Sequence, residues 1–186
     1  MILVNGDSFT AGEESSIAWP SLIADTVNIA NSGASNDHII ASTVFYIQTV
    51  TIPDHVIIAW TNPDRIDISG KHLTATSQER YGKSLVDEVF KDWNKNWART
   101  KFLTQIDLLH GFLESKHIPH LFVSTFDIQT WATGPMDEFY HGWPNQGLVE
   151  WMGDCPKGPG GHPLELGHQR IAEKINEHIR HLGWIS

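Results

Sequence analysis

The chain has 186 residues, of which 40% are apolar and 19% charged, so it suits one globular domain over residues 1–186 and not a disordered tail. Its net charge of −9 argues against nucleic acid or an anionic membrane as partner, because both would repel it. A single cysteine, Cys155, excludes a disulfide within the chain.

The first third of the chain alternates strand-like and helix-like segments. Residues 2–5 are a short apolar run typical of a buried strand. The spacing of apolar residues then predicts a helix over 18–26, a second short strand over 27–30 and a helix over 35–50. Residues 56–60 are continuously apolar and rich in β-branched side chains, which predicts a third, fully buried strand.

The rest of the chain continues this alternation with longer connections. In chain order we expect a polar loop, a helical region in one or two pieces, a buried strand, a long loop with one short element, and a final helix (61–78, 82–117, 121–124, 126–161 with 148–152, and 163–182). Strands and helices in alternation predict a parallel sheet covered on both faces, a three-layer α/β/α sandwich. In such sheets the ligand site lies beyond the carboxyl ends of the strands.

Four segments with polar or glycine residues are brought to that edge by the predicted topology. Ser8 follows the first strand, Gly33 the second and Asn62 the third, while His162 directly precedes the last helix. A serine nucleophile needs a base within hydrogen-bond reach and donors for the oxyanion formed on attack. The alternative is structural: Asp7 and Ser8 would cap a helix, and His162 would be a core histidine.

Other motifs point away from nucleotides and metals. Residues 6–10 lack the second glycine of the lipase G-x-S-x-G elbow. Residues 82–84 imitate the end of a phosphate-binding loop, but its first glycine is missing and no strand precedes it. His162 and His168, with Asp154 and Cys155 nearby, do not have a zinc-site spacing. We therefore expect no cofactor and no metal.

The blocks GDSFTAG, NSGASND, AWTNPDR and GGHPLELGH occur in the order and at separations that resemble the SGNH hydrolases, the GDSL esterase/lipase family. The resemblance implies a flavodoxin-like fold and hydrolysis of carboxylic esters, often acetyl or other acyl groups on sugars and lipids. It implies that Ser8 is the nucleophile and His162 the base. The oxyanion hole would consist of the Ser8 and Gly33 backbone N–H groups and the Asn62 side chain.

The last block departs from the family at the acid of the triad. Where the family has Asp-x-x-His, this chain has Pro159 three residues before His162, and proline cannot orient an imidazole with its side chain. Three outcomes follow: Asp154 reaches back to the histidine, a backbone carbonyl near Pro159 or Gly160 accepts its Nδ1 proton, or the protein is an inactive relative. The third block also departs, since it keeps Asn62 but lacks the family's glycine and aspartate.

Two functions from different classes remain. The first is an esterase acting on a small-molecule or glycan ester, with Asp7, Trp60 and Arg65 as candidate substrate contacts. The second is a catalytically weak or inactive glycan-binding module, with the tryptophan-rich stretch 131–151 as its platform. A metal-dependent hydrolase built on the eleven histidines ranks last. Without a basic leader or a run of roughly 20 apolar residues, we expect a cytoplasmic protein that contacts no membrane.

Overall fold

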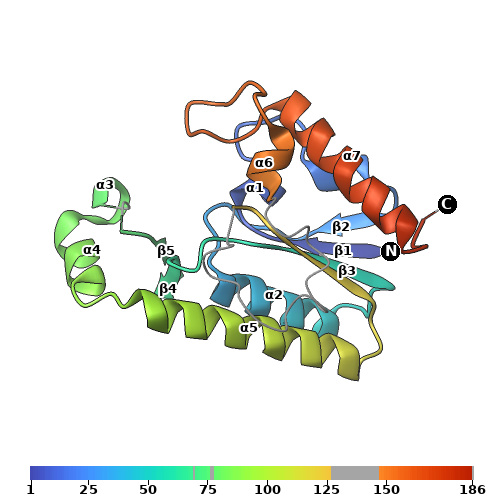
Figure 1. Cartoon of the computed structure of the whole chain (residues 1–186). Coiled ribbons are helices and arrows are strands. Elements are labelled where there is room, and N and C mark those ends of the chain that lie inside the picture. The colour runs from blue at the N-terminus through green and yellow to red at the C-terminus, as the bar shows by residue number, and fades with distance from the viewer. Residues whose placement is uncertain (69, 76–77, 127–146, 186) are drawn as a thin grey trace.

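A parallel four-stranded sheet forms the centre of the protein (Figure 1). The computed structural model describes residues 1–68, 70–75, 78–126 and 147–185. The strands lie in the order β2-β1-β3-β6, and their bounds are Ile2–Asn5 (β1), Thr26–Asn28 (β2), His55–Trp60 (β3) and His120–Ser124 (β6). The predicted parallel sheet is therefore confirmed, although β2 begins one residue earlier and ends two residues earlier than the expected strand over 27–30.

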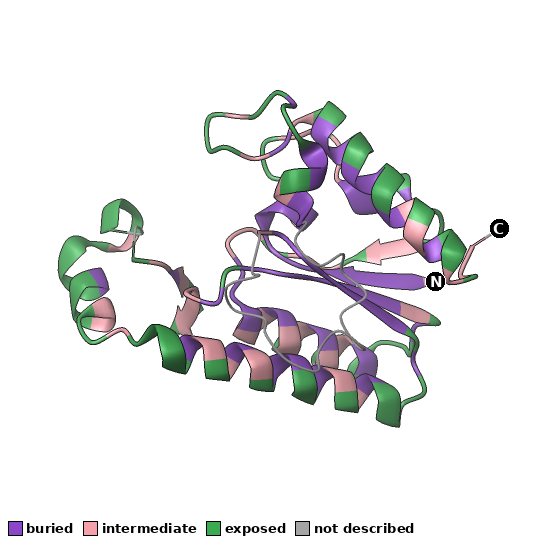
Figure 2. Cartoon of the chain, in the orientation of Figure 1, coloured by how far each residue is buried: buried purple, intermediate pink, exposed green. Residues whose placement is uncertain are grey.

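Helices cover both faces of the sheet, which confirms the predicted three-layer sandwich (Figure 1). One layer contains α1 (Ser8–Ala11), the 3₁₀ helix η1 (Trp19–Leu22), α6 (Leu148–Met152) and α7 (Glu165–His181). The other contains α2 (Asn36–Thr49) and α5 (Lys95–Ser115). Successive strand residues point to opposite faces, so Ile57 packs into the first layer and Ile58 into the second. Figure 2 shows β1, β3 and β6 buried between helices whose outer faces are exposed.

The polar segment after β3 differs from the prediction, because part of the expected loop is an antiparallel hairpin. Its strands are β4 (Ile66–Ile68) and β5 (Lys71–Leu73), with Ile66 opposite Leu73. Leu73 is fully buried, so the hairpin has an apolar anchor that its polar sequence conceals. Two short helices follow, α3 (Gln78–Tyr81) and α4 (Lys83–Phe90), and together with the hairpin they project from one end of the sheet (Figure 1).

The ends of the helices decide two further predictions, those for residues 82–117 and 18–26. The helical region 82–117 forms two pieces, because the Asn94 side chain accepts hydrogen bonds from the Asn96 and Trp97 N–H groups and starts α5 anew. The helix expected over 18–26 is only η1, which Pro20 opens and which leads directly into β2.

The long loop is described only in part. Of residues 126–161, positions 127–146 lie outside the described residues, and the short element expected over 148–152 is α6. Within the described part of the chain, no helix has both the length and the apolar character needed to cross a membrane.

His168 joins α7 to the segment before β2. It lies fully buried in the first turn of α7, and its Nδ1 accepts a hydrogen bond from the Trp19 N–H at 3.2 Å. Burial lowers the pKa of His168 from 6.5 to about 4, although the nearby Glu165 carboxylate opposes the shift. The imidazole is therefore neutral in the folded protein at neutral pH.

This buried histidine predicts a loss of stability in mild acid. Between about pH 6.5 and 4 the unfolded chain binds a proton at His168 that the folded chain does not, so the free energy of unfolding falls as the pH falls. We expect this one group to contribute a loss on the order of 2 kcal/mol. Urea unfolding of the wild type and His168→Gln at pH 7 and pH 4.5 measures it. The pH-dependent loss should be smaller in the variant, and equal losses would contradict the prediction.

Candidate active site

Ser8 lies at the point where the sheet order reverses. The chain leaves β1 toward β2 on one side and returns to β3 on the other, so the carboxyl end of β1 borders the crevice in which α/β sheets bind ligands. Asp7 caps α1 by accepting a hydrogen bond from the Phe9 N–H, and Ser8 is the first residue of that helix. The expected capping role of Asp7 is thus real, and it also holds the Ser8 side chain at the crevice.

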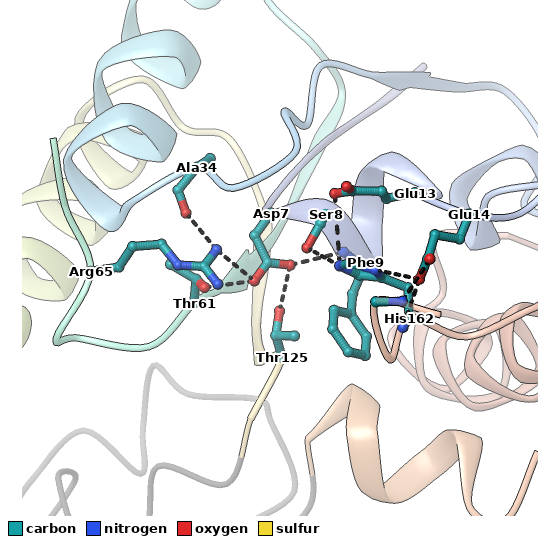
Figure 3. Close-up of polar contacts among 11 residues, drawn as sticks. Asp7, Ser8, Phe9, Glu13, Glu14, Ala34, Thr61, Arg65, Thr125 and His162 are labelled. Carbon is teal, nitrogen blue, oxygen red and sulfur yellow. Dashed lines mark hydrogen bonds and ion pairs between the residues drawn. The ribbon is translucent and has the colours of Figure 1, made fainter. Parts of the chain in front are cut away.

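His162 contacts Ser8 at this edge of the sheet (Figure 3). The Nε2 atom of His162 lies 2.9 Å from the Ser8 Oγ atom, although 154 positions separate the two residues in the chain. This distance is within the reach that a general base needs.

The other ring nitrogen of His162 contacts a carboxylate that the sequence prediction did not include. Nδ1 lies 2.8 Å from Oε2 of Glu14. A carboxylate only accepts hydrogen bonds, so the Nδ1 atom carries the proton and Nε2 presents its lone pair to Ser8. Asp154, the predicted orienting acid, is solvent-exposed, and that prediction is wrong because Glu14 already occupies Nδ1. The same contact argues against the other predicted arrangement, in which a backbone carbonyl accepts the Nδ1 proton of His162.

The glycine-rich loop before α7 is shaped around the Glu14 carboxylate. The Gly160 N–H donates to Oε1 at 2.7 Å, and the His162 N–H donates to Oε2 at 3.3 Å. A Cβ atom at Gly158 would lie only 2.6 Å from the same carboxyl group, so a side chain there would displace it. The Gly160 N–H first, and the His162 side chain second, lower the pKa of Glu14 below its ordinary value. The carboxylate is therefore ionised at neutral pH.

The sequence contained one signal for this acid, the pair Glu13-Glu14 directly after the GDSFTAG block. It did not indicate which of the two turns inward. Glu14 has a φ of +67°, a left-handed conformation that side chains seldom adopt, and its side chain is 21% exposed. Glu13 is 43% exposed and its Oε2 lies 3.7 Å from Nε2 of His162, so it borders the site from the solvent side.

Asp7 connects the carboxyl ends of three strands (Figure 3). Its fully buried carboxylate accepts hydrogen bonds from Thr61 Oγ1 at 2.6 Å, Thr125 Oγ1 at 3.2 Å and the Phe9 N–H at 3.1 Å, and Arg65 Nη1 lies 3.4 Å away. Burial raises the pKa of Asp7, while Arg65 and the hydrogen bonds oppose the shift. The prediction that Asp7 contacts substrate is wrong, because its side chain has no exposed surface.

The two other predicted substrate contacts have different surroundings. Trp60 is fully buried in the second layer, edge-to-face with Phe102 and Phe122, so it cannot contact a substrate and that prediction is wrong. Arg65 is 15% exposed and donates to the Ala34 carbonyl at 3.2 Å as well as to Asp7. These two hydrogen bonds connect Arg65 to the segments that follow β1 and β2. A contact between Arg65 and substrate stays a prediction.

The segment after β3 is held in place by a pair of hydrogen bonds that the sequence analysis missed. The buried Asn36 side chain accepts from the Thr61 N–H and donates to the Thr61 carbonyl, both at 3.0 Å. The next residue, Asn62, is exposed, and its Oδ1 accepts from the Asp64 N–H at 2.9 Å. That bond orients the amide of Asn62 and leaves Nδ2 as its donating group.

Gly33 lies in the tight turn after β2, where the Ala34 N–H donates to the Asn31 carbonyl at 3.0 Å. The Asn31 N–H in turn donates to the Gly6 carbonyl at 3.3 Å, which holds this turn against the segment that carries Ser8. The roles of Ser8, Gly33 and Asn62 in an oxyanion hole stay predictions at this point.

No protein-family model and no curated protein matches the sequence. Solved structures do match along nearly the whole chain. TesA has a TM-score of 0.60 at 15% identity, covering 97% of this chain and 98% of its own. A member of the lipolytic protein G-D-S-L family from Veillonella parvula DSM 2008 has a TM-score of 0.53 at 13% identity, covering 95% and 96%. The lipase Lip_vut3 from a goat rumen metagenome has a TM-score of 0.53 at 12% identity, with the same two coverages. The chain therefore has the SGNH/GDSL hydrolase fold, as its sequence blocks predicted.

Proposed function

We propose that this protein is a serine hydrolase that cleaves carboxylic esters, with Ser8 as nucleophile, His162 as general base and Glu14 as the acid that orients the base. The observation that carries the proposal is the unbroken chain of contacts from Ser8 Oγ to His162 Nε2 at 2.9 Å and from His162 Nδ1 to Glu14 Oε2 at 2.8 Å. Serine, histidine and a carboxylate in this order are the arrangement that activates a hydroxyl on several unrelated folds.

The reaction would proceed by two acyl transfers. His162 takes the Ser8 proton as the hydroxyl oxygen attacks the ester carbonyl carbon. Glu14 stabilises the imidazolium that forms, and His162 then gives its proton to the departing alcohol. Water, deprotonated by His162 in the same way, hydrolyses the acyl-enzyme and restores Ser8. Each proton and bond is accounted for by the three side chains, the ester and water.

The oxyanion would be held by the Ser8 and Gly33 backbone N–H groups and the Asn62 side chain. Three features support this assignment. The Asp7 side chain accepts its capping hydrogen bond from the Phe9 N–H and not from the Ser8 N–H. The Ser8 N–H, at the first helical position, therefore has no role in that cap. The Gly33 turn is bonded to the Ser8 segment through Gly6, and the Asn62 amide is oriented through its oxygen. Each such donor contributes about 10²–10³ in rate.

The substrate class we propose is a small-molecule or glycan carboxylic ester, acetyl esters included. Two of the similar structures are described as a lipolytic protein and a lipase, which are ester-cleaving activities. Glu13, an exposed carboxylate, lies beside His162, and the chain as a whole is acidic. A neutral ester therefore suits this site better than a polyanionic one.

Covalent labelling tests the nucleophile directly. A fluorophosphonate probe should label the wild type at one residue per chain, and peptide mapping should place the label at Ser8. Ser8→Ala should take up no label and should not turn over p-nitrophenyl acetate. Ser21→Ala is the matched control, because the Ser21 side chain is exposed and, among the described residues, donates a hydrogen bond only to the nearby Ala18 carbonyl. This variant should label and turn over like the wild type. Ester turnover by Ser8→Ala at the wild-type rate would remove Ser8 from the mechanism.

The alternative of a glycan-binding module loses its main support. That alternative depended on the lack of an acid for His162, and Glu14 lies at the position where an acid is needed. Of the tryptophan-rich stretch 131–151, positions 131–146 lie outside the described residues, and Trp151 is buried in the first layer. Glycan binding without any fluorophosphonate labelling would restore this alternative.

A further inference from the structure

A second group of titratable side chains lies apart from Ser8 and His162. It combines His38 from the start of α2, Asp67 from β4 and His72 from β5. Asp67 and His72 face each other across the hairpin, and β4 packs against α2 (Figure 1). One ligand atom from each of the three side chains lies within 4.8 Å of the other two.

The two separations that involve Asp67 are close to the edge length of a tetrahedral metal site. Asp67 Oδ2 lies 3.2 Å from Nδ1 of His72 and 3.8 Å from Nδ1 of His38. Ligands at about 2.0–2.1 Å from a tetrahedral zinc ion are about 3.3–3.4 Å apart. The two imidazole rings are edge-to-face with centroids 5.1 Å apart, so they can share an ion without stacking.

The three side chains are also largely shielded from water. His72 is 12% exposed, Asp67 18% and His38 31%. The Nδ1 atom of His72 is itself buried and makes no well-directed hydrogen bond within the described part of the chain, although Asp67 is near. A buried ring nitrogen without a well-directed hydrogen bond is costly in a protein interior, and a shared ion would satisfy it.

We propose that His38, Asp67 and His72 bind one divalent transition-metal ion of the Zn²⁺ or Co²⁺ type. Two imidazoles and one carboxylate suit these ions, whereas Ca²⁺ and Mg²⁺ require several oxygen ligands. The fourth position would hold water. None of its ligands belongs to the Ser8–His162–Glu14 group, so the metal-site proposal does not rest on the proposed ester hydrolysis.

An ion bound at this position would have a structural role beside the candidate active site. A Cβ atom at Gly33 would lie 3.7 Å from the His72 side chain, so this hairpin packs directly on the turn proposed for the oxyanion hole. A metal ion would fasten the hairpin to α2 and hold that turn in place. It would order one wall of the site without entering the acyl transfer.

A second cluster of possible metal ligands on the same chain serves as a comparison. His110, Glu114 and His120 also gather their ligand atoms, at the opposite end of the sheet. There, however, His110 Nδ1 and His120 Nε2 are only 2.8 Å apart, which is the distance of a direct hydrogen bond and shorter than the about 3.3–3.4 Å between two ligands of a tetrahedral site. This cluster therefore supplies the control.

Cobalt titration tests the proposal. Chelator-treated wild type should bind one equivalent of Co²⁺ with the visible absorption of a tetrahedral site, and Zn²⁺ should displace it. Asp67→Asn and His72→Gln should each bind at least about 10-fold more weakly. His110→Gln should bind like the wild type. Added Zn²⁺ should raise the melting temperature of the wild type and of His110→Gln, but not of Asp67→Asn.

The outcomes separate this site from the esterase proposal. Ser8→Ala should bind Co²⁺ as the wild type does, whatever its labelling result. Circular dichroism of the apo proteins checks that the two ligand variants are folded. Absence of Co²⁺ binding by the wild type would overturn the metal site, and so would binding by Asp67→Asn and His72→Gln that is as tight as that of the wild type.

Discussion

Replacing Glu14 by Gln should lower kcat for ester hydrolysis by about 10³–10⁴-fold, with a much smaller change in KM. The glutamine amide is neutral, so it cannot stabilise the imidazolium that His162 becomes in the transition state. Its NH₂ group can also face Nδ1, which would move the ring proton to Nε2 and leave no lone pair for Ser8. Both effects act on the reacting state and not on substrate binding, so they appear in kcat.

Two control variants isolate this role. Glu13→Gln removes a neighbouring carboxylate that lies 3.7 Å from Nε2 and makes no contact with Nδ1, so we expect a change of less than about 10-fold. Asp154→Asn changes the exposed acid that the sequence favoured, and it should behave like the wild type. Steady-state kinetics with p-nitrophenyl acetate gives all three values. A large loss in Asp154→Asn, with Glu14→Gln unaffected, would reverse the assignment.

The elements that the sequence predicted well are those with strong periodicity. β1, β3, β6 and α7 bury continuous or regularly spaced apolar residues, so their hydrophobic pattern alone defines them. Because the carboxyl ends of parallel strands share one edge, the sequence could also place Ser8 near His162 without any contact information. The hairpin β4–β5 escaped prediction, since its strands have three residues each and one buried side chain, Leu73, anchors them.

The details of the site depend on contacts that no spacing rule contains. Glu14 was missed because it reaches His162 through a left-handed backbone conformation and a gap left by Gly158, neither of which has a fixed sequence offset. Asp7 and Trp60 were assigned to substrate because they flank the ends of strands. Their burial depends on tertiary contacts: two threonine hydroxyls donate to Asp7, and two aromatic rings pack against Trp60.

Replacing Asp7 by Ala should lower the free energy of unfolding by about 3–5 kcal/mol. The change removes the cap of α1 and leaves the Thr61 and Thr125 hydroxyls and the Arg65 guanidinium without their shared acceptor. Because these groups come from the ends of β1, β3 and β6, the loss spreads over the edge of the sheet that carries the site. Urea unfolding at pH 7 measures the effect.

Asp7→Asn should be milder, at about 1–2 kcal/mol, because its amide oxygen still accepts hydrogen bonds. It also avoids burying a charge, the cost that raises the pKa of Asp7 in the folded protein. Asp54→Ala is the matched control, because Asp54 pairs with the N-terminal ammonium at the exposed surface, where water screens the ion pair and its effect on stability is small. If Asp7→Ala cost no more than Asp54→Ala, the three strand ends would have to be held by packing, and the carboxylate would not be the group that positions Ser8.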